Sequence, residues 1–205
     1  MYVAVARVDW TDSDIQRVLK KYEKYIILHP RGEFTHFDKE LWRTEAETAI
    51  RYIRDLGLIS PIEMGTTGYG QNWAAIAQYG DDDAATDPLN NTMFLLQLYS
   101  EYAYDVPGTL DEVAAFPRPV IPDACLFTSD YGNTPNTYKE VWDGSYERFL
   151  SSFYRDWIGD GEGNSMTSSG TLDSLNDIGR YLVYDSPAAL SNTIKKAYLQ
   201  NASVN

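Results

Sequence analysis

The residues that could perform chemistry in this sequence are carboxylates in irregular segments with aromatic neighbours. Two carboxylates cleave a glycosidic bond when one acts as an acid and the other as a nucleophile or base, and aromatic side chains often bind the sugar. Five carboxylates are candidates for such a pair: Glu63, Asp81, Asp82, Asp83 and Asp130. Four aromatic residues are candidates for binding a partner: Tyr69, Trp73, Tyr79 and Tyr131. Any acidic, tyrosine-rich chain offers such pairs, so the pattern permits a glycan hydrolase without requiring one.

A calcium loop is present only in part. Asp160, Glu162 and Asn164 alternate as the first ligands of an EF-hand do, but the Gly and the Glu that complete that motif are replaced by Ser165 and Thr171. We therefore predict no metal site, and these three residues are the candidate ligands if the loop does hold calcium.

Other catalytic motifs are missing or incomplete. The loop 65–70 lacks the Lys-Ser/Thr ending of a phosphate-binding loop, so no cofactor is expected. Cys125, the single cysteine, has no histidine near it in sequence. His29 and His36 lie in a connection that contains Pro30, and nothing places them on one face.

The net charge of −13 is concentrated in the middle of the chain. Residues 61–138 hold one basic residue, Arg118, against eleven acidic ones, a net of −10. Direct binding of nucleic acid through its phosphates is therefore not expected. An acidic inhibitor that mimics nucleic acid stays open as an alternative. No segment is long and apolar enough to predict a membrane span.

A buried central helix is predicted over residues 87–104. Asp87 could cap it, Pro88 suits its first turn, and Met93–Tyr104 is largely apolar. Hydrophobic spacing and capping residues predict further helices over residues 13–28, 38–56, 109–116, 138–157, 171–184 and 187–200.

The fold class expected from these patterns is mainly α, or α+β with a few short extended segments. We expect one domain over residues 1–205. Residues 1–57 form its N-terminal arm and helical hairpin, and residues 58–205 form a helical body with long loops.

The first functional interpretation is a non-enzymatic structural subunit of a large assembly, specifically a bacteriophage virion component of the neck, connector or tail. Its partners would be other protein subunits in a homo- or hetero-oligomer, bound through the tyrosine-rich loops. Such a protein would be cytoplasmic when made and would then enter the virion. The alternative from another class is a carboxylate-based hydrolase that acts on glycans.

Overall fold

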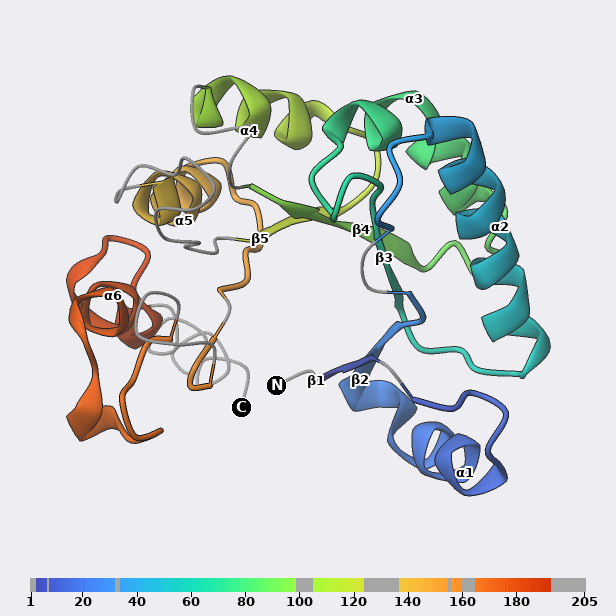
Figure 1. Cartoon of the computed structure of the whole chain (residues 1–205), viewed down its shortest axis with the longest axis horizontal. Coiled ribbons are helices and arrows are strands. Elements are labelled where there is room, and N and C mark those ends of the chain that lie inside the picture. The colour runs from blue at the N-terminus through green and yellow to red at the C-terminus, as the bar shows by residue number, and fades with distance from the viewer. Residues whose placement is uncertain are drawn as a thin grey trace, which may run out of the picture. The chain divides into compact units, whose positions relative to one another are not determined.

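Five parallel strands form the centre of the structure, a computed structural model that describes residues 3–6, 8–31, 34–98, 105–123, 137–154, 156–159 and 165–192. The sheet order follows the chain, β1-β2-β3-β4-β5 (Figure 1). The strands are β1 (Val3–Ala6), β2 (Ile26–His29), β3 (Ile62–Gly65), β4 (Thr92–Gln97) and β5 (Val120–Asp123). The prediction of a mainly helical domain is therefore wrong. Runs of four to six apolar residues are too short for periodicity to separate strand from helix.

A helix connects each strand to the next, as parallel pairing requires. The four connecting helices are α1 (Ser13–Tyr22), α2 (Lys39–Asp55), α3 (Trp73–Ala85) and α4 (Val106–Ala115). A 3-10 turn, η1 (Glu23–Tyr25), follows α1. The later elements are α5 (Thr137–Glu147), η3 (Leu172–Ser174), α6 (Asp177–Arg180) and the π-helical turn η4 (Tyr181–Asp185).

The predicted central helix 87–104 is wrong because its middle is strand β4. Asp87 does not cap a helix. Its carboxylate accepts hydrogen bonds from the backbone N–H of Leu89 at 3.0 Å and of Asn91 at 3.0 Å, and so forms the turn that leads into β4. The last residues of the predicted helix, 99–104, lie outside the described residues.

Helices with a clear N-cap were predicted more accurately. The Asp38 carboxylate accepts from the Leu41 N–H at 3.0 Å and starts α2 as expected. The predicted helix 13–28 ends early at Tyr22, and the apolar residues after it form β2. The predicted start at Thr109 is three residues late, because the Asp105 carboxylate accepts from the Gly108 N–H inside α4.

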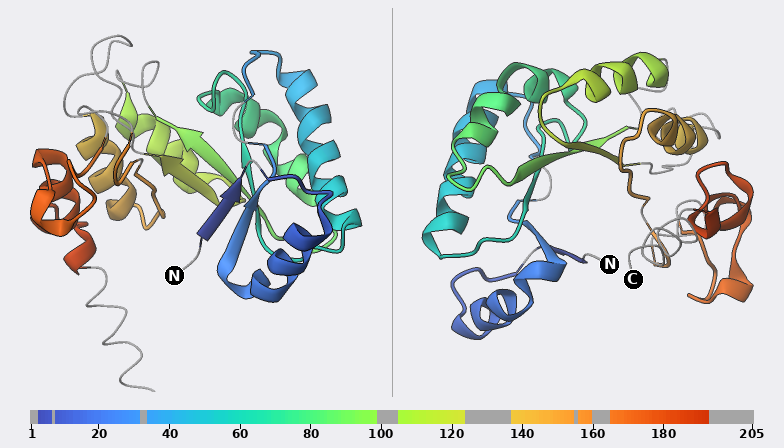
Figure 2. Two further views of the ribbon diagram at one scale, coloured as in Figure 1. Left: turned by 60° about the horizontal axis from the view of Figure 1, so that its bottom comes forward. Right: turned by 180° about the vertical axis from the view of Figure 1, so that it is seen from behind.

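The strands present two different faces. Successive side chains of a strand alternate, so residues paired across the sheet share a face. Met64 pairs with Phe94, and the Phe94 ring lies 6.2 Å from the Trp42 ring of α2. That face carries the hydrophobic core beneath α1, α2 and α3, which all lie on one side of β1–β4 (Figure 2). His29, Glu63 and Gln97 alternate with core residues and therefore face away from these helices.

The chain divides into two compact units. The first comprises Met1–Gln97 with Ala115–Ile121, and the second Leu98–Ala114 with Pro122–Asn205. In the second unit, Arg148 Nε donates to the Asp111 carboxylate at 2.7 Å and joins α5 to α4. The Asp143 carboxylate accepts from the hydroxyls of Tyr181 and Ser186, so it connects α5 to η4 and to the residue that follows η4.

Candidate functional site

Three buried polar side chains of the first unit lie on the neighbouring strands β2, β3 and β4. His29 ends β2, Gln97 ends β4, and Glu63 lies two residues before the end of β3. All three are buried and lie on the sheet face opposite the helices. In parallel α/β sheets the carboxyl ends of the strands and their following loops form the ligand site. These side chains therefore define the candidate functional site.

His29 and Glu63 form the closest polar contact of this site. Because Leu28 pairs with Ile62 across the sheet, the two side chains that follow them stand next to each other. His29 Nδ1 lies 2.9 Å from Glu63 Oε2, and the side chains are only 10% and 3% exposed. Among the described residues Glu63 Oε1 has no hydrogen-bond partner. A buried acceptor without a partner is rare in native proteins and calls for an explanation, such as a bound water, ion or ligand.

The loop after β3 is held firmly over the carboxyl edge of the sheet. Trp42 Nε1 donates to the Gly65 carbonyl at 3.0 Å, and the Gly68 N–H donates to the His36 carbonyl at 2.8 Å. Gly70 has a φ of +80°, and a Cβ there would lie 2.9 Å from the Gln97 side chain. The Gln97 N–H donates to the Gly70 carbonyl at 2.8 Å. Glycine at this position thus lets the loop pack directly on the end of β4.

Gln71, on the loop after β3, carries another buried acceptor without a partner. Its side chain is buried, and Oε1 has no hydrogen-bond partner within the described part of the chain. Such groups are rare in native proteins, because a buried polar atom without a partner costs about 1–3 kcal/mol. Glu63 and Gln71 thus supply two buried acceptor oxygens of the first unit that have no partner among the described residues.

A second group of side chains resembles a catalytic triad but is not placed to act as one. It consists of Thr67 in the position of a nucleophile, His36 in that of a base and Glu45 in that of the acid that orients the base. His36 Nδ1 lies 3.3 Å from Thr67 Oγ1, and His36 Nε2 lies 2.9 Å from Glu45 Oε2. However, Thr67 is fully buried, and its hydroxyl donates to the His36 carbonyl. The three residues therefore fix the loop rather than attack a substrate.

The structure separates the candidate carboxylates that the sequence grouped. Glu63 lies on β3 beside His29, whereas Asp81, Asp82 and Asp83 lie near the end of α3, which runs back toward the start of β4. Asp81 accepts from Arg118 Nε at 2.6 Å. Asp130 lies outside the described residues.

Asp83 is a buried carboxylate away from the carboxyl edge of the sheet. Its side chain is not exposed, and neither of its oxygens has a hydrogen-bond partner among the described residues. Burial, with the nearby Glu47 carboxylate, raises the pKa of Asp83 to about 7, although Arg43 at 3.9 Å opposes this shift. Asp83 therefore belongs to the packing between α2 and α3.

The candidate binding aromatics also differ in their settings. Trp73 packs edge-on against Phe116 with ring centroids 5.5 Å apart, and the buried Tyr79 donates its hydroxyl to the Glu40 carboxylate. Tyr69 is exposed on the loop after β3. Tyr131 and the three candidate calcium ligands, Asp160, Glu162 and Asn164, lie outside the described residues. Within the described ranges, no three His, Cys, Asp or Glu side chains are grouped so that they could hold a metal ion.

Sequence reasoning considered His29 only as a metal ligand and set it aside, and it did not single out Gln71 or Gln97. Each follows a short apolar run or a glycine-rich turn, which is the pattern of a strand followed by a loop. That signal was readable at Ile26–His29, where the apolar run stops at a His-Pro pair. At Gln97 the signal is hidden, because the apolar run 93–98 also fits a helix.

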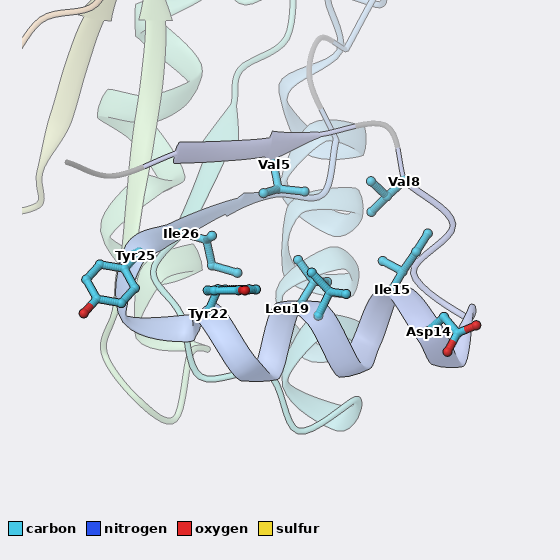
Figure 3. Close-up of a pocket in the computed structure, with 9 residues that line it drawn as sticks. Val5, Val8, Asp14, Ile15, Leu19, Tyr22, Tyr25 and Ile26 are labelled. Atoms are coloured by element: carbon cyan, nitrogen blue, oxygen red, sulfur yellow. The ribbon is translucent and has the colours of Figure 1, made fainter.

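A large pocket between α1 and the first two strands lies on the helix-covered face (Figure 3). It has a volume of about 560 Å³. Its lining is Val5, Val8, Asp14, Ile15, Val18, Leu19, Tyr22, Tyr25 and Ile26. Because Asp14 is its one charged residue and sits at its end, this pocket does not supply the paired polar groups of a catalytic site.

The chain is similar to β-mannanases. It is 30% identical over 112 residues to a mannan endo-1,4-beta-mannosidase of Salipaludibacillus agaradhaerens, a match that covers 54% of this chain and 35% of that protein. Among solved structures it resembles a β-mannanase from Thermomonospora fusca, with a TM-score of 0.74 and 21% identity over 87% of this chain and 61% of the other. It also resembles the catalytic domain of a mannanase from Streptomyces sp. SirexAA-E, with a TM-score of 0.76 and 18% identity over 87% and 58% of the two chains. No family model matches the sequence.

These similarities correct the first functional interpretation. The matched structures share the TIM-barrel-like α/β fold, and the chain spans about a third of the curated relative and about three fifths of these solved structures. The interpretation as a bacteriophage virion component is contradicted, because the similar proteins are mannan-cleaving enzymes. The findings favour the alternative, a glycan hydrolase.

Proposed function

We propose that this chain acts on β-1,4-linked mannan as a glycoside hydrolase, and that Glu63 is one carboxylate of its site. The observation that carries the proposal is the buried His29–Glu63 pair, on the face opposite the helices in a sheet whose fold resembles that of β-mannanases. The curated mannosidase, 30% identical over 112 residues, supports mannan as the substrate class.

The chemistry assigned to Glu63 follows from its setting. One oxygen is held by His29, and the other is unpaired among the described residues and can exchange a proton with a glycosidic oxygen or a water. Hydrolysis needs a second carboxylate at a distance of about 5–5.5 Å for retention or about 6.5–9.5 Å for inversion. The stereochemistry of the product would therefore report the position of that second group.

The test is release of reducing ends from soluble galactomannan, with xylan and a soluble cellulose as comparison substrates. We expect cleavage of mannan and a loss of about 100-fold or more in Glu63→Gln, which keeps the size of the side chain but cannot donate or accept the catalytic proton. Asp82→Asn is the matched control, because Asp82 is exposed near the end of α3. Equal activity of Glu63→Gln and the unmodified chain would reject Glu63, and no release of mannan fragments would reject the proposed reaction.

A further inference from the structure

A second pocket in the first unit combines aromatic and paired charged side chains. It lies where the connections after β1 and β2 meet α2, and its volume is about 350 Å³. Its lining comes from three separate parts of the chain: Trp10, Pro30, Arg31, Thr44, Glu45, Thr48, Ala49 and Tyr52. The volume is at the lower end of the range for small-molecule sites, about 300–1,000 Å³.

The charged side chains of this pocket, Arg31 and Glu45, form an ion pair with no net charge. Arg31 Nη1 donates to Glu45 Oε1 at 3.0 Å, and the Arg31 guanidinium lies 4.6 Å from the centre of the Phe34 ring. The Arg31 side chain is nevertheless 50% exposed, so N–H groups remain available to a ligand. Because the Glu45 carboxylate offsets the charge of Arg31, the pocket suits a neutral ligand with several hydroxyls better than an anion.

The remaining walls are suited to an apolar ring face. Gln16 Nε2 donates to the backbone carbonyl of Trp10 at 2.8 Å and fixes the chain at this position, and Tyr52 lies on α2 with 40% of its surface exposed. Aromatic side chains offer a large rigid apolar area at a small loss of conformational freedom. A pyranose ring matches both halves of the pocket, since it has an apolar C–H face and a rim of hydroxyls.

The pocket is also linked to the candidate site. Glu45, which pairs with Arg31, accepts from His36 Nε2 through its other oxygen at 2.9 Å. The His36 carbonyl accepts from the Gly68 N–H at 2.8 Å, in the loop that covers the edge of β3 and β4. Arg31 follows His29 by two residues, so a ligand in this pocket would lie near the end of β2. It would also lie beside Glu45, which is linked through His36 to the loop after β3.

We propose that this pocket is an accessory subsite that binds a sugar ring of a mannan chain away from the His29–Glu63 pair. The identity of the sugar rests on the proposed function, whereas the fit to a neutral polyhydroxylated ring rests on the pocket. The subsite holds the polysaccharide near the carboxyl edge and takes no part in bond cleavage.

Affinity electrophoresis in native gels cast with soluble galactomannan tests this subsite. Trp10→Ala and Tyr52→Ala should raise the dissociation constant obtained from the retardation by about three- to tenfold, because each removes one aromatic wall. Arg31→Met should weaken binding without changing the aromatic walls. Tyr184→Ala is the matched control, since Tyr184 is an exposed tyrosine in the second unit. Gels cast with xylan measure the contribution of general polysaccharide binding.

The outcomes separate this inference from the proposed function. Weaker retardation in all three pocket variants with an unchanged Tyr184→Ala variant supports the subsite, whether or not the chain releases reducing ends. If the chain binds galactomannan but never cleaves it, the proposed hydrolysis fails while the subsite stands. Equal retardation of the folded pocket variants and the unmodified chain, with folding checked by circular dichroism, would overturn the subsite. Absence of any retardation of the unmodified chain would overturn it as well.

Discussion

Breaking the buried ion pair between Arg54 and Asp87 should destabilise the chain more than breaking an exposed ion pair of the first unit. Arg54 Nε and Nη2 each donate to one Asp87 carboxylate oxygen at 2.8 Å, and the side chains are 6% and 0% exposed. The same carboxylate accepts from the Leu89 and Asn91 N–H groups and from Thr92 Oγ1. Asp87 therefore joins the end of α2 to the turn before β4.

Replacing Arg54 by alanine would leave a buried carboxylate without its cation. The Arg54 guanidinium also donates to the carbonyls of Leu58 at 2.7 Å and Ser60 at 2.9 Å, which would lose a donor. Breaking one side of a buried pair costs about 3–5 kcal/mol of unfolding free energy. Arg51→Ala is the control, because the Arg51 side chain is 57% exposed in a helical pair with Glu47, and such pairs contribute about 0.3–0.5 kcal/mol.

The stability lost in Arg54→Ala should depend on pH, through the pKa of Asp87. Burial alone would raise the pKa of Asp87, but hydrogen bonds from Arg54, the Leu89 and Asn91 amides and Thr92 hold it well below its usual value. The unmodified chain therefore keeps this stabilisation above the unfolded pKa of about 3.9 and loses it only as pH falls through the lower folded value. Without Arg54 the pKa of the Asp87 carboxylate rises. Asp87 is then protonated at mildly acid pH, which removes the buried charge and reduces the destabilisation of the variant.

Urea unfolding at pH 7 and pH 4 measures this difference. Arg54→Ala should lose about 3–5 kcal/mol at pH 7 and clearly less at pH 4, where Asp87 can be neutral. Arg54→Met combined with Asp87→Asn should recover part of the loss, because neither charge is then buried alone. A loss below about 1 kcal/mol at pH 7, or an equal loss at both pH values, would refute the reasoning.

Two further positions test the packing of the first unit. Gly70→Ala should lower the free energy of unfolding by about 2 kcal/mol, and Gly57→Ala by about 1 kcal/mol. Both glycines have a positive φ, but a Cβ at Gly70 would also approach the Gln97 side chain. Equal losses for the two variants in urea unfolding would show that this contact does not affect stability. Burial and Glu47 raise the pKa of Asp83 to about 7, so the unfolding free energy of the unmodified chain should fall as pH rises from about 4 to about 7. Asp83→Asn should remove that slope and be more stable at pH 8 by about 1 kcal/mol or more, and a slope that persists in the variant would assign it to another group.

Helices with strong local signals could be read from the sequence. Lys39–Asp55 has Asp38 as its N-cap and a long apolar stripe, so its limits agree with the prediction to within one residue. Residues 109–116 were also predicted as a helix, but α4 begins at Val106, where the Asp105 carboxylate accepts from the Gly108 N–H of the first turn. Local hydrogen bonds decide such boundaries, which makes them accessible from nearby residues.

The strands could not be read in this way because their pairing is not local. Ile26–His29 is four residues long and buried throughout, so it shows neither the alternation of a half-exposed strand nor a helical period. Thr92–Gln97 was assigned to a helix because a polar turn with Asp87 and Pro88 precedes it. The Asp87 carboxylate pairs instead with Arg54, which is distant in sequence, and that contact was not visible in the chain alone.

The choice among the candidate carboxylates depends on those strand assignments. Once Ile62–Gly65 is a strand, alternation places Glu63 on the face opposite the core residues Ile62 and Met64, next to His29 of the neighbouring strand. The helix that follows runs back along the sheet, so it carries Asp81–Asp83 away from the carboxyl edge. The sequence alone does not distinguish Glu63 from Asp81–Asp83 as catalytic candidates, whereas the topology of the sheet does. Glu63 therefore becomes the catalytic candidate through the sheet face on which its side chain lies and through its neighbour His29, and not through the acidic residues around it in sequence.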